Sequence, residues 1–167
     1  MRSCLKALCI KFVTAAGLTE NRLVRGATGN NIVADMTVAD LNPSQIDWLV
    51  FPGADKTEAA VNLDKELQNI VTAHWENGGK IAAICAAPAL VLGPLGIISE
   101  TPATGYPFLK DEFEKNGGTY SNDNVVVTDR LITSKGPGTT LEFALAVVRI
   151  AKGEETEKAL REGMVIM

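Results

Sequence analysis

The feature that most constrains the fold is a short apolar run that ends in a cysteine. Residues 81–84 read Ile-Ala-Ala-Ile, the composition of a strand buried on both faces of a sheet, and Cys85 follows them directly. Residues 86–92 are small or apolar and predict a short helix. A side chain between such a strand and helix lies at the carboxyl end of the sheet, where the unpaired N–H groups of the helix favour an anion. The pattern therefore predicts a nucleophile elbow whose thiol loses its proton more readily than free cysteine.

A buried, inert thiol is the alternative interpretation, because free cysteines are among the most buried residues. The other two cysteines, Cys4 and Cys9, are expected to pack as small hydrophobic side chains. Three cysteines without a CxxC spacing predict neither a disulfide framework nor a zinc site. The single histidine, His74, rules out a metal site built from several histidines. We expect no metal and no cofactor.

Strands and helices alternate along the chain. Continuous apolar runs such as 47–51 suit a parallel sheet that is covered on both faces. We therefore expect a single domain over 1–167 with a doubly wound α/β sandwich, whose ligands bind at the carboxyl ends of the strands. Further strands are predicted at 10–15, 32–36, 125–127 and 131–134, the last two as a hairpin, and helices at 5–9, 63–76, 108–116, 141–152 and 154–162.

Charge and hydropathy exclude several classes of protein. The net charge of −4 and the lack of a Lys/Arg-rich stretch argue against a nucleic-acid or anionic-membrane surface. No apolar run is long enough to cross a bilayer. Lys6 and Lys11 interrupt the apolar residues near the start, so a signal peptide is not predicted. We expect a cytoplasmic protein.

Two other features have ordinary structural interpretations. Gly136-Pro137-Gly138-Thr139 lacks the spacing of a phosphate-binding loop, so we predict a tight turn in which Thr139 or Thr140 caps the next helix. His74 lies on the apolar face of the 63–76 helix and is expected to pack there rather than to reach the cysteine.

Three segments together resemble the ThiJ/PfpI family. They are residues 81–88 around the elbow, the Phe-Pro-Gly turn at 51–53, and residues 133–144 with their Gly-Pro-Gly-Thr block. The resemblance extends from about residue 5 to the C-terminus and looks closest to the branch that includes the Parkinson-disease protein deglycase. It implies a flavodoxin-like α/β sandwich with a mostly parallel sheet, a homodimer, and a reactive cysteine linked to glyoxal chemistry, oxidative sensing or protection of other proteins.

The resemblance also assigns roles to residues of the site. It makes Cys85 the nucleophile and the redox-sensitive thiol, and it forms an oxyanion pocket from backbone N–H groups that match Ala54, after Gly53, and Ala86. Many members have Gly-Gly where this chain has Gly53-Ala54, so a Cβ at Ala54 alters the turn or narrows the pocket. Tyr106 stands where the branch often carries a histidine; it is a possible pocket residue that donates hydrogen bonds but is a poor base near neutral pH.

The largest departure from the family is at the beginning of the chain. Residues 1–8 resemble the helix that follows the family's first strand, and 10–15 resemble its second strand. We therefore expect the first strand to be absent, together with the glutamate on it that hydrogen-bonds the cysteine. Glu20 does not replace this glutamate, because it follows the second strand. An exposed strand edge and a cysteine without its main polar partner are the expected consequences.

These residues lead to a hypothesis about function with alternatives. The first hypothesis is a cysteine-dependent enzyme, a hydrolase or lyase of the glyoxalase III or deglycase kind, that acts on small dicarbonyls or on glycated proteins. A redox-sensing or chaperone-like stress protein with an oxidisable Cys85 and no turnover is the second. A cysteine peptidase or amidase is weaker, because that chemistry usually needs a histidine beside the cysteine. A structural relative with an inert thiol remains open as well.

Overall fold

The sheet at the centre of the molecule has four strands. The computed structural model describes residues 15–16, 22–25, 29–53, 65–99 and 101–166. The strands lie in the order β5 (Trp48–Phe51), β6 (Lys80–Ile84), β10 (Leu131–Ser134) and β9 (Val125–Val127). The first three are parallel, and β9 is antiparallel to β10, as the predicted hairpin requires. The elements predicted at 5–9 and over 10–14 lie outside the described residues.

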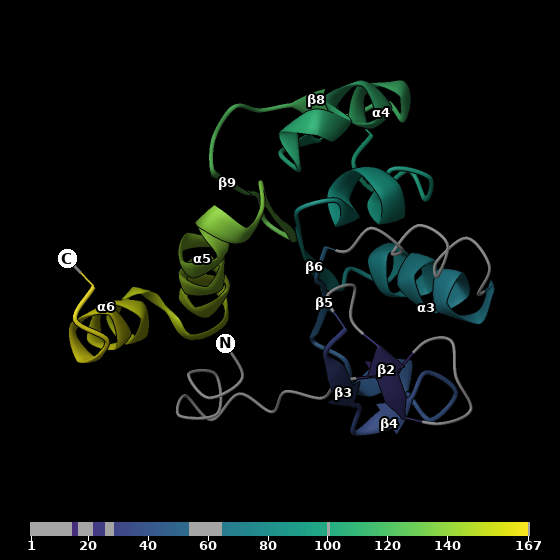
Figure 1. Ribbon diagram of the computed structural model, residues 1–167, viewed down its shortest axis with the longest axis horizontal. Coiled ribbons are helices and arrows are strands. Elements are labelled where there is room, and N and C mark those ends of the chain that lie inside the picture. The colour runs from purple at the N-terminus through teal and green to yellow at the C-terminus, as the bar shows by residue number, and fades with distance from the viewer. Residues whose placement is uncertain (1–14, 17–21, 26–28, 54–64, 100, 167) are drawn as a thin grey trace.

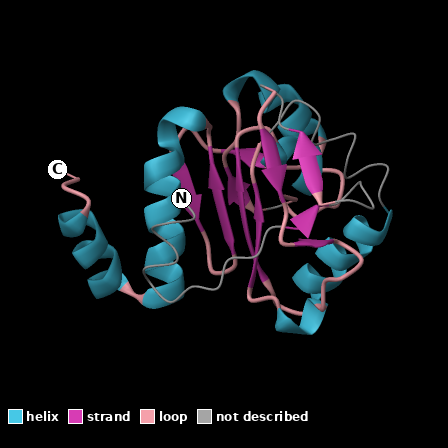
Figure 2. Ribbon diagram, turned by 60° about the horizontal axis from the view of Figure 1, so that its bottom comes forward, coloured by secondary structure: helices cyan, strands magenta, loops and turns pink. Residues whose placement is uncertain are grey.

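Helices cover both faces of this sheet, which confirms the predicted three-layer α/β architecture (Figures 1 and 2). Successive residues of a strand point to opposite faces, and the two hydrophobic clusters of the core follow this alternation. Ile81, Ala83 and Leu131 belong to one cluster, and Ala82, Ile84 and Ile132 belong to the other. The central strands β6 and β10 are thus buried on both sides; for residues 81–84 of β6 the apolar sequence predicted this burial.

The helices begin and end close to their predicted bounds. On one face lie α3 (Lys65–Glu76), the π-helical η2 (Pro88–Leu92) and α4 (Lys110–Lys115), which contribute Val71, Leu92 and Phe113 to the first cluster. On the other face lies α5 (Thr140–Lys152), whose Phe143 and Val147 fill the second. Two 3-10 turns, η3 (Pro107–Leu109) and η4 (Pro137–Thr139), lead into α4 and α5, and a further one, η1, spans Pro43–Gln45.

The single strand predicted at 32–36 is wrong. The structure has two short strands here, β3 (Asn31–Val33) and β4 (Met36–Thr37). β3 pairs antiparallel with β2 (Leu23–Arg25), and β4 pairs parallel with β1 (Ala15–Ala16). Between these two strands the chain turns inward. Ala34 is buried there, and its N–H donates to the carbonyl of Arg22 at 2.7 Å. A third short pair joins β7 (Pro102–Ala103) to β8 (Thr119–Tyr120).

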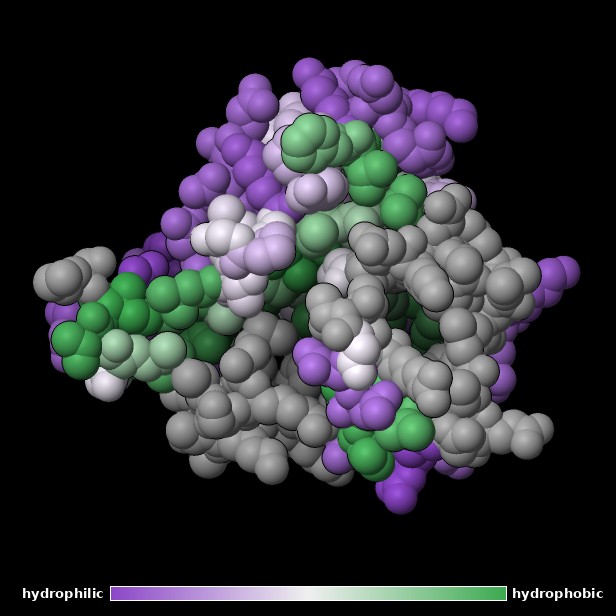
Figure 3. Space-filling model, in the orientation of Figure 1, coloured by the Kyte–Doolittle hydropathy of each residue, from purple (hydrophilic) through white to green (hydrophobic). Residues whose placement is uncertain are grey.

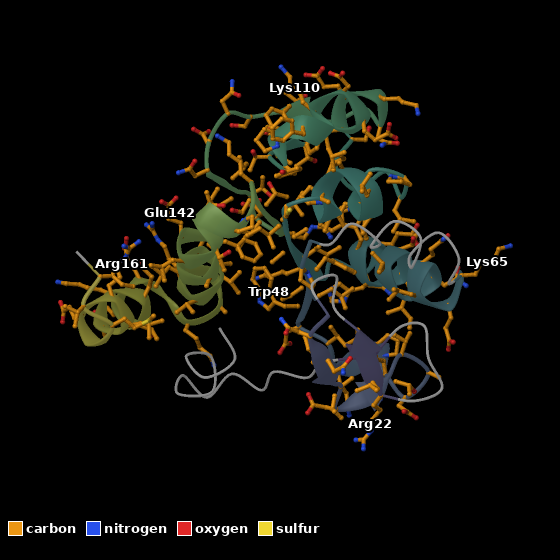
Figure 4. The ribbon with its side chains drawn as sticks, viewed as in Figure 1. Arg22, Trp48, Lys65, Lys110, Glu142 and Arg161 are labelled. Carbon is orange, nitrogen blue, oxygen red and sulfur yellow. The ribbon has the colours of Figure 1, made fainter. Side chains whose placement is uncertain are left out.

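β5 is an edge of the four-stranded sheet in the described part of the chain, where it pairs only with β6. Trp48, Leu49 and Val50 are half-buried, whereas Ile81–Ile84 of β6 are buried throughout. Trp48 lies between the sheet and α5 (Figure 4), and the Nζ of Lys80 lies 5.5 Å from the centre of its ring. The long side chains of Trp48 and Lys80 thus shield part of the strand's apolar surface.

The C-terminal segment lies away from the sheet. α6 (Glu154–Gly163) packs against α5 at the far side of that helix from the strands (Figures 1 and 2). Hydrophobic side chains gather on its surface (Figure 3), and Val165 beyond its end is 82% exposed. Val165 therefore does not pack on the sheet.

Candidate active site

Cys85 occupies a sharp corner between β6 and the turn that precedes η2. Its φ angle is 66°, and Val165 is the only other described non-glycine residue with a positive φ. An L-residue in this left-handed region is strained, and such strain persists only where the surrounding structure holds it. The corner turns the thiol out of the buried strand, so that Cys85 is partly accessible while Ile81–Ile84 before it are buried. This is the backbone conformation that a nucleophile elbow requires.

Two backbone hydrogen bonds hold the strained residue from both ends. The Cys85 N–H donates to the carbonyl of Ser134 at 2.9 Å, and the Cys85 carbonyl accepts from the Tyr106 N–H at 2.8 Å. Ser134 ends the neighbouring strand β10, and Tyr106 precedes η3. The position of the thiol is therefore set by the sheet on one side and by the 102–107 segment on the other.

Three glycines surround Cys85, and the space for a side chain differs among them. A Cβ on Gly53 would lie 2.3 Å from the Cys85 Cβ and 2.8 Å from the Ile84 carbonyl oxygen, far inside van der Waals contact. A Cβ on Gly105 would lie 3.3 Å from the Cys85 carbonyl oxygen. Gly136 approaches the thiol itself, since its Cβ would lie 4.0 Å from Sγ and 3.7 Å from the Cδ2 of Tyr106.

The predicted oxyanion pocket is described in part. Ala86 is buried, and its N–H donates no hydrogen bond to any residue in the described ranges. A Cβ on Gly53 would lie 3.0 Å from the Ala86 nitrogen, so the missing side chain leaves room in front of this donor. Ala54, the other predicted donor, lies outside the described residues.

His74 is far from the thiol, as its position on α3 indicated. It is buried rather than at the edge, and its Nε2 lies 3.0 Å from the carbonyl oxygen of Lys80. Gly79 makes space for the ring, because a Cβ there would lie 2.3 Å from Nε2. Lys80 begins β6 and Ile84 ends it, so the ring and the thiol are separated by the length of the strand, about 13 Å at 3.3 Å per residue. The chain's only histidine therefore forms no pair with Cys85.

The Gly-Pro-Gly-Thr block is the tight turn that the sequence predicted. The Thr139 Oγ1 accepts from the Gly136 N–H at 3.1 Å, and it lies 2.6 Å from the Oγ of the buried Ser134. The Thr140 Oγ1 donates to the Pro137 carbonyl at 2.9 Å. Both threonines thus bond the turn itself. The prediction that one of them caps the next helix is wrong, because Thr139 at the N-cap of α5 makes no side-chain capping bond. Gly136 is left beside the thiol, a contact that the predicted turn did not anticipate.

Tyr106 lies at the pocket, and the structure adds Phe108 beside it. The two ring centres are 5.4 Å apart with the ring planes at 49°. Tyr106 is 37% exposed and Phe108 86% exposed. Sequence reasoning placed Phe108 in a helix and gave it no role in the site. The sequence signal that could have indicated this pair is the Tyr-Pro-Phe run at 106–108, in which a proline separates two aromatic residues.

The described residues contain no group of three or more His, Cys, Asp or Glu side chains that could hold a metal ion. Within the same part of the chain, the helices are too short or too polar to cross a membrane.

Helices on both faces of a mostly parallel sheet, with a cysteine at a strained strand-to-helix corner, define a flavodoxin-like α/β protein with an elbow thiol. The chain belongs to the DJ-1/PfpI family, whose model matches residues 4–150.

Known proteins resemble the chain over most of its length. It is 36% identical over 137 residues to glutathione-independent glyoxalase DJR-1.2 of Caenorhabditis elegans, an alignment that covers 82% of this chain and 72% of that protein. It is 34% identical over 143 residues to protein DJ-1 homolog A of Arabidopsis thaliana, covering 86% of this chain but only 36% of that longer protein. The crystal structure of Drosophila melanogaster DJ-1beta superposes with a TM-score of 0.88 at 33% identity, covering 99% of this chain and 88% of that one.

Replacing Gly136 with alanine is expected to block the thiol without disturbing the fold. The backbone of Gly136 is extended (φ 165°, ψ −161°), and the added methyl group would make ordinary contacts with Sγ and with Tyr106. We expect alkylation of Cys85 to slow on the order of tenfold, because a small displacement of an approaching reagent is costly. The rate is measured by mass spectrometry of the Cys85 peptide.

Gly138→Ala is the matched control, because nothing lies within 4 Å of a Cβ at Gly138 in the same turn. Equal labelling rates in the two variants would contradict the placement of Gly136 beside the thiol.

Proposed function

We propose that the protein acts on small α-oxoaldehydes such as methylglyoxal, or on the adducts that they form with proteins, through the thiol of Cys85. The observation that carries the proposal is the strained, partly accessible cysteine at the carboxyl end of the sheet, held by Ser134 and Tyr106. Two relatives support the chemistry by their names, since one is called a glutathione-independent glyoxalase and another, from Pyrococcus horikoshii, a deglycase.

The first step of the proposed reaction is addition of the thiolate to the aldehyde. A bond forms between Sγ and the aldehyde carbon, and the carbonyl electrons move to oxygen, which gives a hemithioacetal. In the proposal the N–H of Ala86, the residue that follows Cys85, stabilises this oxygen; it has no acceptor among the described residues, which supports the role. Ala54 is the second donor in the proposal.

The later steps convert the hemithioacetal to a hydroxy acid without an external oxidant. The proton on the carbon bonded to sulfur is removed, and the neighbouring carbonyl carbon gains one through an enediol, so one carbon is oxidised and the other reduced. Water then cleaves the resulting thioester and releases the acid and the thiolate. Among the described residues no side chain hydrogen-bonds Sγ, so we assign the proton transfers to water in the pocket.

The experiment that tests the proposal is the conversion of methylglyoxal to lactate by the purified protein, read together with protection of Cys85. Methylglyoxal at increasing concentration should slow alkylation of Cys85, and lactate should form at a rate that saturates over the same range. Protection without lactate would leave a thiol that binds dicarbonyls and does not turn them over. The absence of both would reject the proposal.

A redox sensor is the second candidate, because the same accessibility exposes the thiol to peroxide. Limiting peroxide would oxidise Cys85 before Cys4 and Cys9 in that case. The peptidase alternative loses its support, because the only histidine bonds the Lys80 carbonyl at the other end of β6. The homodimer remains a proposal that rests on the family resemblance, and the cytoplasmic location remains a proposal that rests on the sequence pattern.

A further inference from the structure

The aromatic rings of Tyr106 and Phe108 form a feature of the site that the proposed chemistry does not use. Addition of a thiolate to an aldehyde needs a sulfur and an oxyanion donor, and neither ring supplies them. Phe108 is nevertheless the most exposed large hydrophobic side chain among the described residues, at 86%. Solvent exposure of a large apolar ring gives up the stabilisation of about 1.5–3 kcal/mol that burial provides. The fold therefore gains nothing evident from a phenylalanine at this position.

The Tyr106 ring lies beside the thiol. A single methyl group on Gly136 would contact both the sulfur of Cys85 and the ring of Tyr106, at 4.0 and 3.7 Å. The sulfur and the ring thus border the same small space. Phe108 extends this surface outward, since its ring centre is 5.4 Å from that of Tyr106.

The backbone around the two rings is firmly held. The Tyr106 N–H donates to the Cys85 carbonyl, and the Leu109 N–H donates to the Tyr106 carbonyl at 2.9 Å. Pro107 between the two aromatic residues fixes one backbone angle and starts the η3 turn. The backbone of Tyr106 is therefore fixed relative to the Cys85 carbonyl, and the two rings extend from a turn that is formed before any ligand arrives.

Charged groups nearby are engaged elsewhere. Lys110 follows the pair, but its Nζ lies 3.7 Å from Glu114 Oε1 and 5.8 Å from the centre of the Tyr120 ring, and it projects from the outer end of the molecule (Figure 4). The surface offered by Tyr106 and Phe108 is therefore apolar and aromatic, and suits a planar or apolar group better than an ionic one.

We propose that Tyr106 and Phe108 form a specificity subsite that binds the organic substituent of the molecule that reacts with Cys85. The subsite favours aryl-substituted or bulky apolar α-oxoaldehydes over glyoxal, which has no substituent. This inference rests on the proposed function, because it concerns the same thiol. The preference for an aryl or bulky apolar substituent should nevertheless hold for any electrophile that reacts with the sulfur of Cys85.

The test uses two maleimides, which need no turnover. N-phenylmaleimide and N-ethylmaleimide both add Sγ across their double bond, with a proton from water completing the product, and they differ in the group that would occupy the subsite. The rate of labelling of the Cys85 peptide is measured for each on the native protein. The ratio of the two rates is then divided by the ratio for glutathione, which removes the intrinsic difference in reactivity.

In the wild-type protein this normalised ratio should exceed one by roughly three- to tenfold, the scale of one aromatic contact. Phe108→Ala should reduce it toward one, because the phenyl group of the reagent loses one of its two aromatic contacts and N-phenylmaleimide is slowed more than N-ethylmaleimide. Phe108→Leu should give an intermediate value. Val127→Ala is the matched control, because Val127 is also an exposed apolar residue but lies on β9 and outside the aromatic pair.

The outcomes separate the subsite from the proposed function. A ratio of one in the wild type, or a ratio that Phe108→Ala does not change, would reject the subsite while leaving methylglyoxal turnover to be judged by itself. A raised ratio that falls in Phe108→Ala, in a protein that forms no lactate, would establish the subsite and reject the enzyme. No labelling of Cys85 by either reagent in the native protein would reject both.

Discussion

Cys85→Ser is expected to abolish methylglyoxal turnover while leaving the fold intact. The hydroxyl of serine is a far weaker nucleophile than a thiolate, and it needs an adjacent base. The chain's only histidine bonds the Lys80 carbonyl at the opposite end of β6, and no described side chain hydrogen-bonds the sulfur position. The rate of lactate formation should therefore fall by roughly 10³-fold or more, as for removal of a nucleophile.

The measurement compares steady-state rates of the two proteins after circular dichroism has shown that both fold. The left-handed conformation at position 85 is as strained for serine as for cysteine, so the melting temperatures should be similar. A Cys4→Ser/Cys9→Ser variant that keeps Cys85 is the control, and it should retain the wild-type rate. Lactate formation that survives in Cys85→Ser would show that the elbow thiol is not the nucleophile.

Gly53→Ala is expected to be the most damaging single-methyl change around the site. The new Cβ would lie 2.3 Å from the Cys85 Cβ, 2.8 Å from the Ile84 carbonyl oxygen and 3.0 Å from the Ala86 nitrogen. These atoms belong to the backbone or are attached directly to it, so no flexible side chain can move aside. We expect destabilisation of about 1–3 kcal/mol from overpacking, which corresponds to a fall in melting temperature of roughly 2–12 °C for a chain of this size.

Chemical reactivity should fall together with stability in this variant, because the corner that carries the sulfur must shift to admit the methyl group. Thermal unfolding and the rate of Cys85 alkylation below the transition are the two measurements. Gly138→Ala again provides a control with open space around the new Cβ. A Gly53→Ala protein with wild-type melting temperature and wild-type labelling would mean that the Phe51–Gly53 turn does not pack against the elbow.

The sequence alone was sufficient to predict the central strands and the elbow at Cys85. Ile81–Ile84 are apolar on both faces and therefore buried, and Cys85 stands at the point where this strand meets a run of small residues. Leu131–Ser134 were predicted as a strand from Leu131 and Ile132, and the structure buries Thr133 and Ser134 as well. Patterns of this kind involve only residues that are neighbours in the sequence, so the sequence alone predicts them. The strands β1 to β4 have only two or three residues each, too few for a period, and their pairing could not be predicted.

The glycines around Cys85 were harder to predict. Gly53 was recognised through a family resemblance, but Gly105 and Gly136 come from loops that are distant in sequence from the cysteine. Their closeness depends on the pairing of β6 with β10 and on the Tyr106–Cys85 hydrogen bond. Phe108 was missed for a similar reason, since an exposed phenylalanine has no periodic signature and gains meaning only from the ring beside it.

Two kinds of residue surround the Cys85 thiol: glycines that pack against the elbow backbone, and aromatic residues whose side chains are exposed. Gly53 and Gly105 are pressed against the backbone of the elbow, so substitutions there disturb the corner before they alter its chemistry. The side chains of Tyr106 and Phe108 project from a turn that is held by its backbone, and the fold does not depend on their rings. Substitutions should therefore be poorly tolerated at Gly53 and Gly105 and well tolerated at Tyr106 and Phe108. Selection could change which molecules reach the sulfur without rebuilding the corner that holds it.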